Sequence, residues 1–95
     1  TMVDLDISGT IDVDGTTNLD IVDIDGAVNI AAATTIATNN KIIFRDAAIH
    51  ISSTADGDLS IAADDEIDLT STLIDINGNV EISGTATTTG QTQVQ

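Results

Sequence analysis

The sequence predicts an all-β fold, and three observations support this prediction. Hydrophobic and polar residues alternate with a period of two along most of the chain, as in Asp4-Leu5-Asp6-Ile7 and Ile74-Asp75-Ile76. All but two of the 16 acidic residues are Asp, which is unfavourable inside helices. No segment places its apolar residues at the three- and four-residue spacing of a helix face. Each strand should therefore have one apolar and one polar face.

The alternation predicts short strands separated by turns that contain Gly. In these turns Gly is expected to adopt positive φ, and Asp or Asn tolerates it. The predicted turns are Ser8-Gly9, Asp14-Gly15, Asp25-Gly26, Asp56-Gly57, Asn77-Gly78 and Ser83-Gly84. The predicted strands are Val3–Ile7, Ile11–Val13, Leu19–Ile21, Val28–Ile30, Ile42–Phe44, Ile49–Ile51, Leu59–Ile61, Ile67–Leu69, Ile74–Ile76 and Val80–Ile82.

Several of these strands are joined by a three-residue link with Gly in the middle, as between Ile76 and Val80. A two-residue hairpin at Asn77-Gly78 would instead pair Ile76 with Asn79 and mix the two faces. The three-residue link aligns Ile76 with Val80, which fits both a three-residue hairpin and the corner of a β-solenoid. These two connections stay open.

The apolar faces of the predicted strands must be buried, but the sequence predicts no amphipathic helix that could pack against them. With 95 residues, no Cys and Phe44 as the only aromatic residue, the chain lacks the usual means of stabilising a small core. A single-chain solenoid favours a constant repeat length, whereas the apolar segments here recur at irregular intervals. We therefore predict an elongated, intertwined homotrimeric β-helix or β-prism fibre with parallel copies. The alternative is a single-chain β-solenoid.

Residues 1–84 should form this β-repeat fibre segment, and the uncharged, Thr- and Gln-rich residues 85–95 should be a link or a truncated end. The trimer core should contain the side chains that alternation turns inward. The predicted core residues are Leu5, Ile7, Ile11, Val13, Leu19, Ile21, Val28, Ile30, Ile42, Phe44, Ile49, Ile51, Leu59, Ile61, Ile67, Leu69, Ile74, Ile76, Val80 and Ile82.

The charge balance excludes two classes of partner. Lys41 and Arg45 are the only cationic side chains beside 16 acidic ones, and the net charge is −14. Binding a phosphate backbone requires clusters of Lys and Arg, and an anionic membrane repels an acidic surface. We therefore expect neither a nucleic-acid nor a membrane partner. Lys41 and Arg45 should pair with carboxylates of a neighbouring copy, such as Asp46 or the acidic residues at 64–66.

The residues do not indicate an enzyme, and we predict no catalytic site. There is no Cys to act as a nucleophile, and alternation turns the single histidine, His50, away from the face of Ile49 and Ile51. Ser52, His50 and Asp46 include the residue types of a catalytic triad, but such residues are common in any strand.

Two acidic segments resemble the opening of calcium-binding loops. Asp12-x-Asp14-Gly15 and Asp23-x-Asp25-Gly26 place carboxylates next to a Gly turn. Neither segment continues to the Glu that completes a helix-loop-helix calcium site, and alternating Asp on a strand face explains both. We predict no cofactor and no metal-binding residue, with Ca²⁺ or another cation at the acidic surface as the alternative. The corresponding second hypothesis is a calcium-dependent, monomeric β-solenoid adhesin module.

A resemblance to a known class of protein lies in the second half of the chain. Its residues are Lys41-Ile-Ile-Phe-Arg-Asp46, Ala55-Asp-Gly-Asp-Leu59, Ala62-Ala-Asp-Asp-Glu-Ile67 and Ile74-Asp-Ile-Asn-Gly-Asn-Val80. They resemble the repetitive β-rich segments of marine bacteriophage and cyanophage tail-fibre or tail-spike proteins.

The resemblance implies a structural, non-enzymatic shaft segment of the virion that lies outside the host cell and supports host attachment as a stable homotrimer. Its expected partners are further copies of itself and flanking fibre domains, with a host-cell surface receptor as a further candidate.

Overall fold

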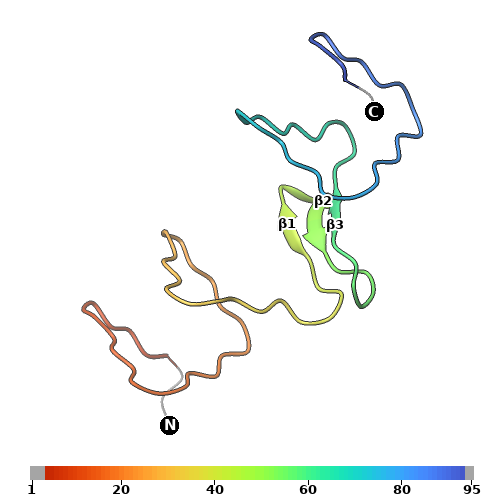
Figure 1. The fold of residues 1–95 in the computed structure, drawn as a ribbon. Coiled ribbons are helices and arrows are strands. Elements are labelled where there is room, and N and C mark those ends of the chain that lie inside the picture. Colours follow the sequence, from red (N-terminus) through yellow and green to blue (C-terminus); the bar gives the residue numbers. More distant parts are fainter. Residues whose placement is uncertain (1–3, 94–95) are drawn as a thin grey trace. The chain divides into compact units, whose positions relative to one another are not determined.

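The computed structural model describes residues 4–93 and confirms the all-β class. Its strands are β1 (Ile42–Phe44), β2 (Asp46–Ser52) and β3 (Ser60–Ala62), and no helix occurs among these residues (Figure 1). The chain divides into two units, Thr1–Thr35 and Ile36–Gln95, and all three strands belong to the second. Val3, at the start of the first predicted strand, lies outside the described residues.

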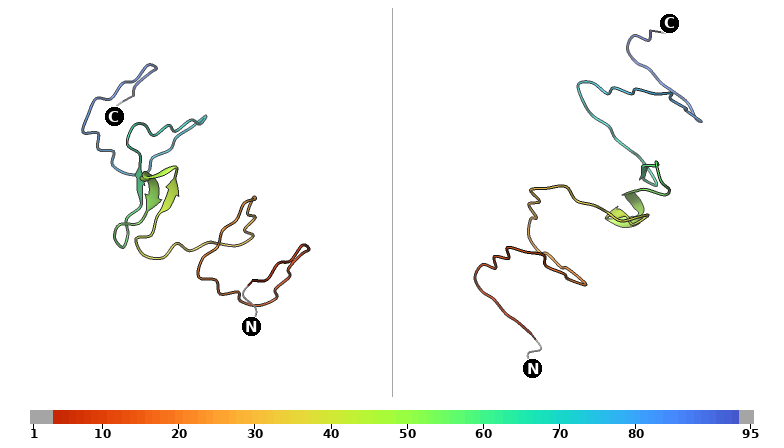
Figure 2. Two further views of the ribbon diagram at one scale, coloured as in Figure 1. Left: turned by 180° about the vertical axis from the view of Figure 1, so that it is seen from behind. Right: turned by 60° about the horizontal axis from the view of Figure 1, so that its bottom comes forward.

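The three strands form one antiparallel sheet in the order β1-β2-β3 (Figure 1). Figure 2 shows the chain from two further directions. β2 is the central strand, and β1 and β3 are the two edges. Because β1 and β3 are both antiparallel to β2, they run in the same direction.

The pairing register confirms the predicted alternation within this sheet. Ile51 in β2 lies directly opposite Ile42 in β1 and Ile61 in β3, so these three isoleucines form a row on one face. His50 lies opposite Ile43 and Ala62, which places a second row on the other face. His50 is therefore turned away from the face of the three isoleucines, as predicted.

The connection between β1 and β2 is a very tight turn followed by a bulge. Phe44 pairs with Asp46 across Arg45, whose φ of 75° is unusual for a residue other than Gly. The register shifts between Ile43 and Phe44, which leaves extra residues on β2. The Ala48 N–H donates to Oδ1 of Asp46 at 3.0 Å, and this bond holds the bulged segment.

The connection between β2 and β3 is a turn that requires Gly57. The Asp58 N–H donates to the carbonyl of Ala55 at 3.1 Å, and Gly57 has a φ of 89°. A Cβ at Gly57 would meet no atom within 4 Å, so only the backbone conformation restricts this position.

We therefore expect Gly57→Ala to lower the stability of the folded protein by about 1–2 kcal/mol, because L-residues with a Cβ are strained in the left-handed region. The measurement is denaturant unfolding of the purified protein, with Gly78→Ala as the control. The control position also has open space for a Cβ and its φ is not positive, so the substitution should be neutral or slightly stabilising. Equal losses in the two variants would contradict the assignment of the strain to Gly57.

The other turns differ from the sequence-based expectation. Gly57 is the only described glycine with positive φ, so the expected positive φ is wrong for the glycines of the other predicted turns. These are Gly9, Gly15, Gly26, Gly78 and Gly84. The chain bends at each of these glycines, but no paired strands flank the bends, so none of them needs the left-handed conformation.

The strands also form at fewer places than predicted. Ile42–Phe44 coincides with β1, Ile49–Ile51 lies within β2, and Leu59–Ile61 is shifted by one residue from β3. The described parts of the other seven predicted segments form no strand. A strand needs hydrogen bonds from a neighbour, and in the single chain these segments have none.

Candidate self-association surface

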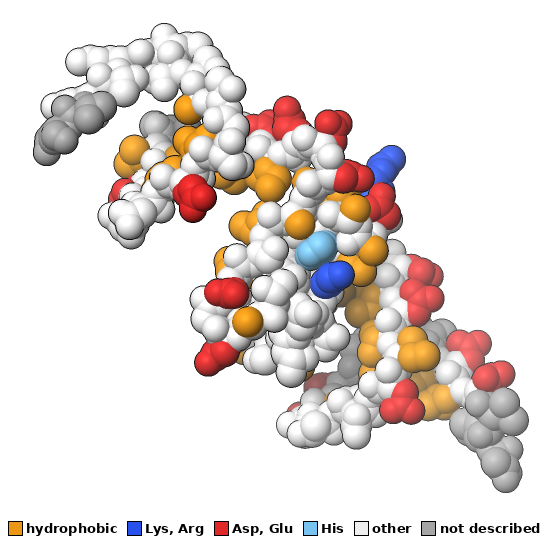
Figure 3. All heavy atoms as spheres, turned by 90° about the vertical axis from the view of Figure 1, so that its right-hand side faces the viewer, with side chains coloured by type: hydrophobic (Ala, Val, Ile, Leu, Met, Phe, Trp, Pro, Cys, Tyr) orange, Lys and Arg blue, Asp and Glu red, His pale blue; other side chains and the backbone are white. Residues whose placement is uncertain are grey.

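The apolar side chains of the single chain are not covered by other parts of the chain. No hydrophobic residue among residues 4–93 is buried. Of the predicted core residues, only Ile49 and Ile51 are half-buried, and the exposed fraction of the others rises from 44% at Ile42 to 90% at Ile21. Figure 3 shows hydrophobic side chains at the surface beside acidic ones. The residues predicted to form a core therefore face solvent in the isolated chain.

The accessible surface of the chain is much larger than that of a compact monomer of the same mass. The chain has 9853 Å² of accessible surface, whereas a folded monomer of 9.7 kDa exposes about 5,100 Å². The excess of roughly 4,700 Å² is far above the ~800 Å² that each partner buries in a standard interface, and it also exceeds the roughly 1,000–2,500 Å² per partner of most obligate ones. A single stable association would need to cover much of the chain.

The β1 edge carries both cationic side chains of the protein. Lys41 and Arg45 flank β1, and both are exposed. Arg45 adopts a φ of 75°, a conformation that costs an L-residue about 1–2 kcal/mol and that Gly or Asn would adopt more easily. Backbone strain of this kind concentrates at functional positions. Arg45 is therefore the residue of this turn that we consider a candidate for a functional role.

The β3 edge leads into the most acidic stretch of the second unit. β3 ends at Ala62, and the acidic residues that follow it are Asp64, Asp65, Glu66 and Asp68. These acidic residues are exposed. Because β1 and β3 run in the same direction, Arg45 and the start of the acidic stretch both follow the same end of the sheet. The two edges of one sheet therefore have opposite charge at corresponding positions.

The residues of the possible catalytic triad form no hydrogen bond with one another in the described part of the chain. His50 Nδ1 lies 2.9 Å from the carbonyl oxygen of Ala47, and because a carbonyl only accepts, the proton is on Nδ1. The Asp46 carboxylate accepts from the Ala48 backbone, and Ser52 Oγ is buried without a hydrogen-bond partner. Ser52 is 5% exposed and is the most enclosed side chain described. In this arrangement His50 is held by the backbone of its own bulge.

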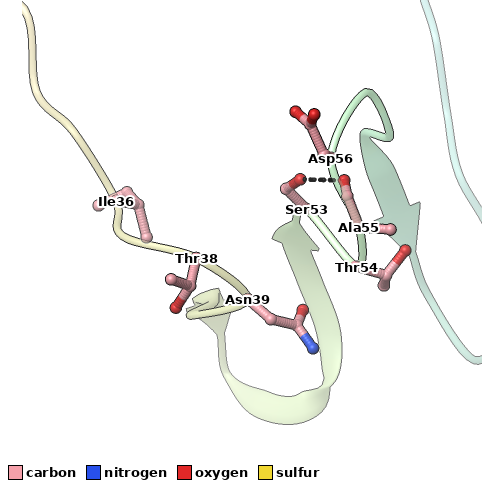
Figure 4. Close-up of a pocket in the computed structure, with 7 residues that line it drawn as sticks. All are labelled: Ile36, Thr38, Asn39, Ser53, Thr54, Ala55 and Asp56. Atoms are coloured by element: carbon pink, nitrogen blue, oxygen red, sulfur yellow. Dashed lines mark hydrogen bonds between the residues drawn. The ribbon is translucent and has the colours of Figure 1, made fainter.

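A hollow of about 500 Å³ lies beside the connection between β2 and β3 (Figure 4). Ile36, Thr38 and Asn39 line it from the segment before β1, and residues 53–56 line it from the connection. Ser53 Oγ donates to the Ala55 carbonyl at 2.9 Å, so this hydroxyl is already engaged. Asp56 is the only charged residue of the lining, and the hollow therefore lacks a cluster of reactive or charged groups.

The acidic segments considered for calcium do not assemble into a metal-binding group in the single chain. Among residues 4–93, no three His, Asp or Glu side chains lie together in a way that could hold an ion. Asp12, Asp14, Asp23 and Asp25 are all exposed.

No helix in the described part of the chain is long and apolar enough to cross a membrane. No protein-family model, curated protein or solved structure matches the chain.

Proposed function

We propose that the chain is a structural, non-enzymatic segment of a bacteriophage tail-fibre or tail-spike shaft that supports host attachment as a stable parallel homotrimer. The observation that carries this proposal is the exposure of the aliphatic residues. The chain is 41% hydrophobic, yet no hydrophobic residue among those described is buried in the single copy. Hydrophobic burial is the dominant favourable term in folding, so a stable form of this chain requires a partner.

The same observation favours several chains over a single-chain solenoid. A solenoid stacks its repeats around a core within one chain. Residues 4–93 contain no such core, although the period-two alternation that would supply it is present throughout. The alternation is instead suited to a core built between chains.

The distribution of the exposed residues favours copies of the same chain as partners. Exposed aliphatic side chains extend from Leu5 to Ile82, with acidic residues between many of them. A partner that covers them must have a matching length and a matching period of two. An identical copy meets both conditions, and parallel copies related by a threefold axis repeat each apolar layer.

The role of a shaft follows from these properties and from the resemblance to phage fibre segments. A trimer whose strands are joined laterally gives reach and stiffness, and it needs no catalytic residue. Host contact through a receptor, and location in the virion outside the cell, are parts of the same proposal. Flanking fibre domains would carry the recognition.

The test is the solution mass by light scattering after size exclusion, at low and high salt, with and without a calcium chelator. We expect a mass of three chains under every condition. A single-chain mass that is stable only with calcium would overturn the trimer and support the adhesin module. A single-chain mass under all conditions would overturn both.

Salt should raise the thermal stability of the trimer. Three copies at −14 each carry −42, and their mutual repulsion is screened within about 30 Å at 0.01 M salt and about 3 Å at 1 M. We expect the melting temperature to rise steadily with NaCl, and to rise equally with MgCl₂ or CaCl₂ at matched ionic strength. A rise that only calcium produces would contradict diffuse screening and indicate a specific ion site.

A further inference from the structure

We infer that the β1 edge of one copy pairs in parallel with the β3 edge of the next, with Arg45, which follows β1, facing the acidic residues that follow β3. This inference rests on the proposed homotrimer and names the contact that closes it. The occupant of the β1 edge is thus a second copy of this chain.

The direction of the edge strands permits a closed ring. β1 and β3 run the same way, so placing β3 of one copy beside β1 of the next repeats the same contact between successive copies. A contact between two different surfaces closes into a ring when the rotation allows it, and three copies give a nine-stranded arrangement without a free edge. Free edges are prone to unwanted pairing, which such closure removes.

The charges favour this contact between copies over a contact within one copy. Within one sheet β2 lies between β1 and β3, so the two edges are about 10 Å apart. Beside a second copy, β1 and β3 are separated by one strand spacing of about 4.8 Å. Arg45, which follows β1, then lies at the level of Asp64, which follows β3 of the neighbouring copy, whereas Lys41 precedes β1 and lies at the other end of the contact.

The contact also joins the apolar rows. Ile42, Ile51 and Ile61 cross the face of one sheet from edge to edge. Edge-to-edge pairing of three copies extends this row into a continuous layer of isoleucines. The layer would face inward, and the row of Ile43, His50 and Ala62 would face outward. The same contact therefore supplies backbone hydrogen bonds, charge pairing and apolar cover.

The decisive experiment introduces two cysteines into a chain that has none. In the Ile43→Cys/Ala62→Cys variant the two thiols of one chain are separated by β2, beyond the Cα separation of about 7 Å that a disulfide can bridge. Between copies they lie on facing edges. We expect mild oxidation to give covalently linked trimers on a denaturing gel. A second variant, Ile43→Cys/Ser60→Cys, tests the pairing register in which β3 is shifted by two residues relative to β1.

The control pair is Ile43→Cys/Ala55→Cys, in which the second thiol lies in the connection before β3 and should give no linked trimer. Light scattering of the reduced proteins separates the two proposals. A trimeric mass with no crosslink in either edge pair overturns this inference alone, whereas a monomeric mass of the unsubstituted chain overturns the proposed function as well.

A charge variant tests the pairing independently. Arg45→Gln should raise the concentration at half-association at least roughly tenfold at low salt. The control, Thr16→Glu, reaches the same net charge with Arg45 retained and should raise this concentration less. Equal shifts would contradict a local role of Arg45.

Discussion

Ile42→Asp is expected to abolish the trimer. Ile42 is in the row of isoleucines on the face that we propose as the core, and in three parallel copies the new carboxylates would meet in one layer. Removing an ion from water costs several kcal/mol even after relaxation, and three such ions are comparable with the whole stability of 5–15 kcal/mol expected for a domain. Light scattering of the variant should give the mass of a single chain.

The neighbouring residue provides a matched control. Ile43→Asp replaces the same side chain by the same charge one position along β1, but on the opposite face of the sheet. Ile43 is already 52% exposed, against 44% for Ile42, so exposure alone does not distinguish the two positions. We expect the Ile43→Asp variant to stay trimeric. Equal loss of assembly in both variants would show that the assignment of the faces is wrong.

Hydrogen exchange should reveal strands that exist only in the assembly. In the trimer, the backbone amides of predicted strands outside the sheet, such as Leu19–Ile21 and Ile74–Ile76, should exchange at least roughly a hundredfold more slowly than in the single chain. This factor corresponds to an opening free energy of about 3 kcal/mol. The physical reason is that these segments lack a partner strand in one copy and gain one from a neighbour.

The Ile42→Asp variant supplies the monomeric reference for this measurement. In the monomer, protection should be confined to β1, β2 and β3, because these strands pair within the single chain. Residues 85–93 should be unprotected in both samples, as expected for a link. If the amides of residues 19–21 and 74–76 exchange equally fast in trimer and monomer, the assembly does not order these segments. Their residues then do not belong to the core.

The proposed contact between sheet edges would let the chain select its own copies. Backbone pairing and apolar packing are the same for many β-rich partners, whereas the two cations occur only beside β1. Arg45, which follows β1, would favour the register that brings the acidic residues after β3 next to it. Repulsion between the remaining carboxylates would oppose other registers, which is how charge commonly gives specificity.

Much of the local structure was predictable because it depends on nearest neighbours along the chain. The alternation correctly predicted the all-β class, the shared face of Ile42, Ile51 and Ile61 and the opposite face of His50. The turn at Gly57 followed from the Asp56-Gly57 pair. The bulge at residues 46–50 was missed, because it depends on the φ of Arg45 and on the bond from Ala48 to Asp46.

The candidate surface was predictable only in part. The sequence pointed to Lys41, Arg45 and the acidic residues at 64–66 as partners between copies, but it does not show that Arg45 and these acidic residues follow opposite edge strands of one sheet. That relation depends on the strand order and on β2 being central. Nothing in the pattern indicated that Ser52 is the most enclosed residue described, since small polar residues in a strand carry no signal of burial.

By itself, the sequence of this protein determined the strand class and the acidic surface, because both follow from composition and a period of two, and on the same grounds it predicts a partner. The tertiary structure decided which segments pair within one copy and which stay unpaired. Pairing requires hydrogen bonds between residues that lie far apart along the chain, and the order of the strands sets those partners. Only this order places a cationic edge and an acidic edge at the two sides of one sheet.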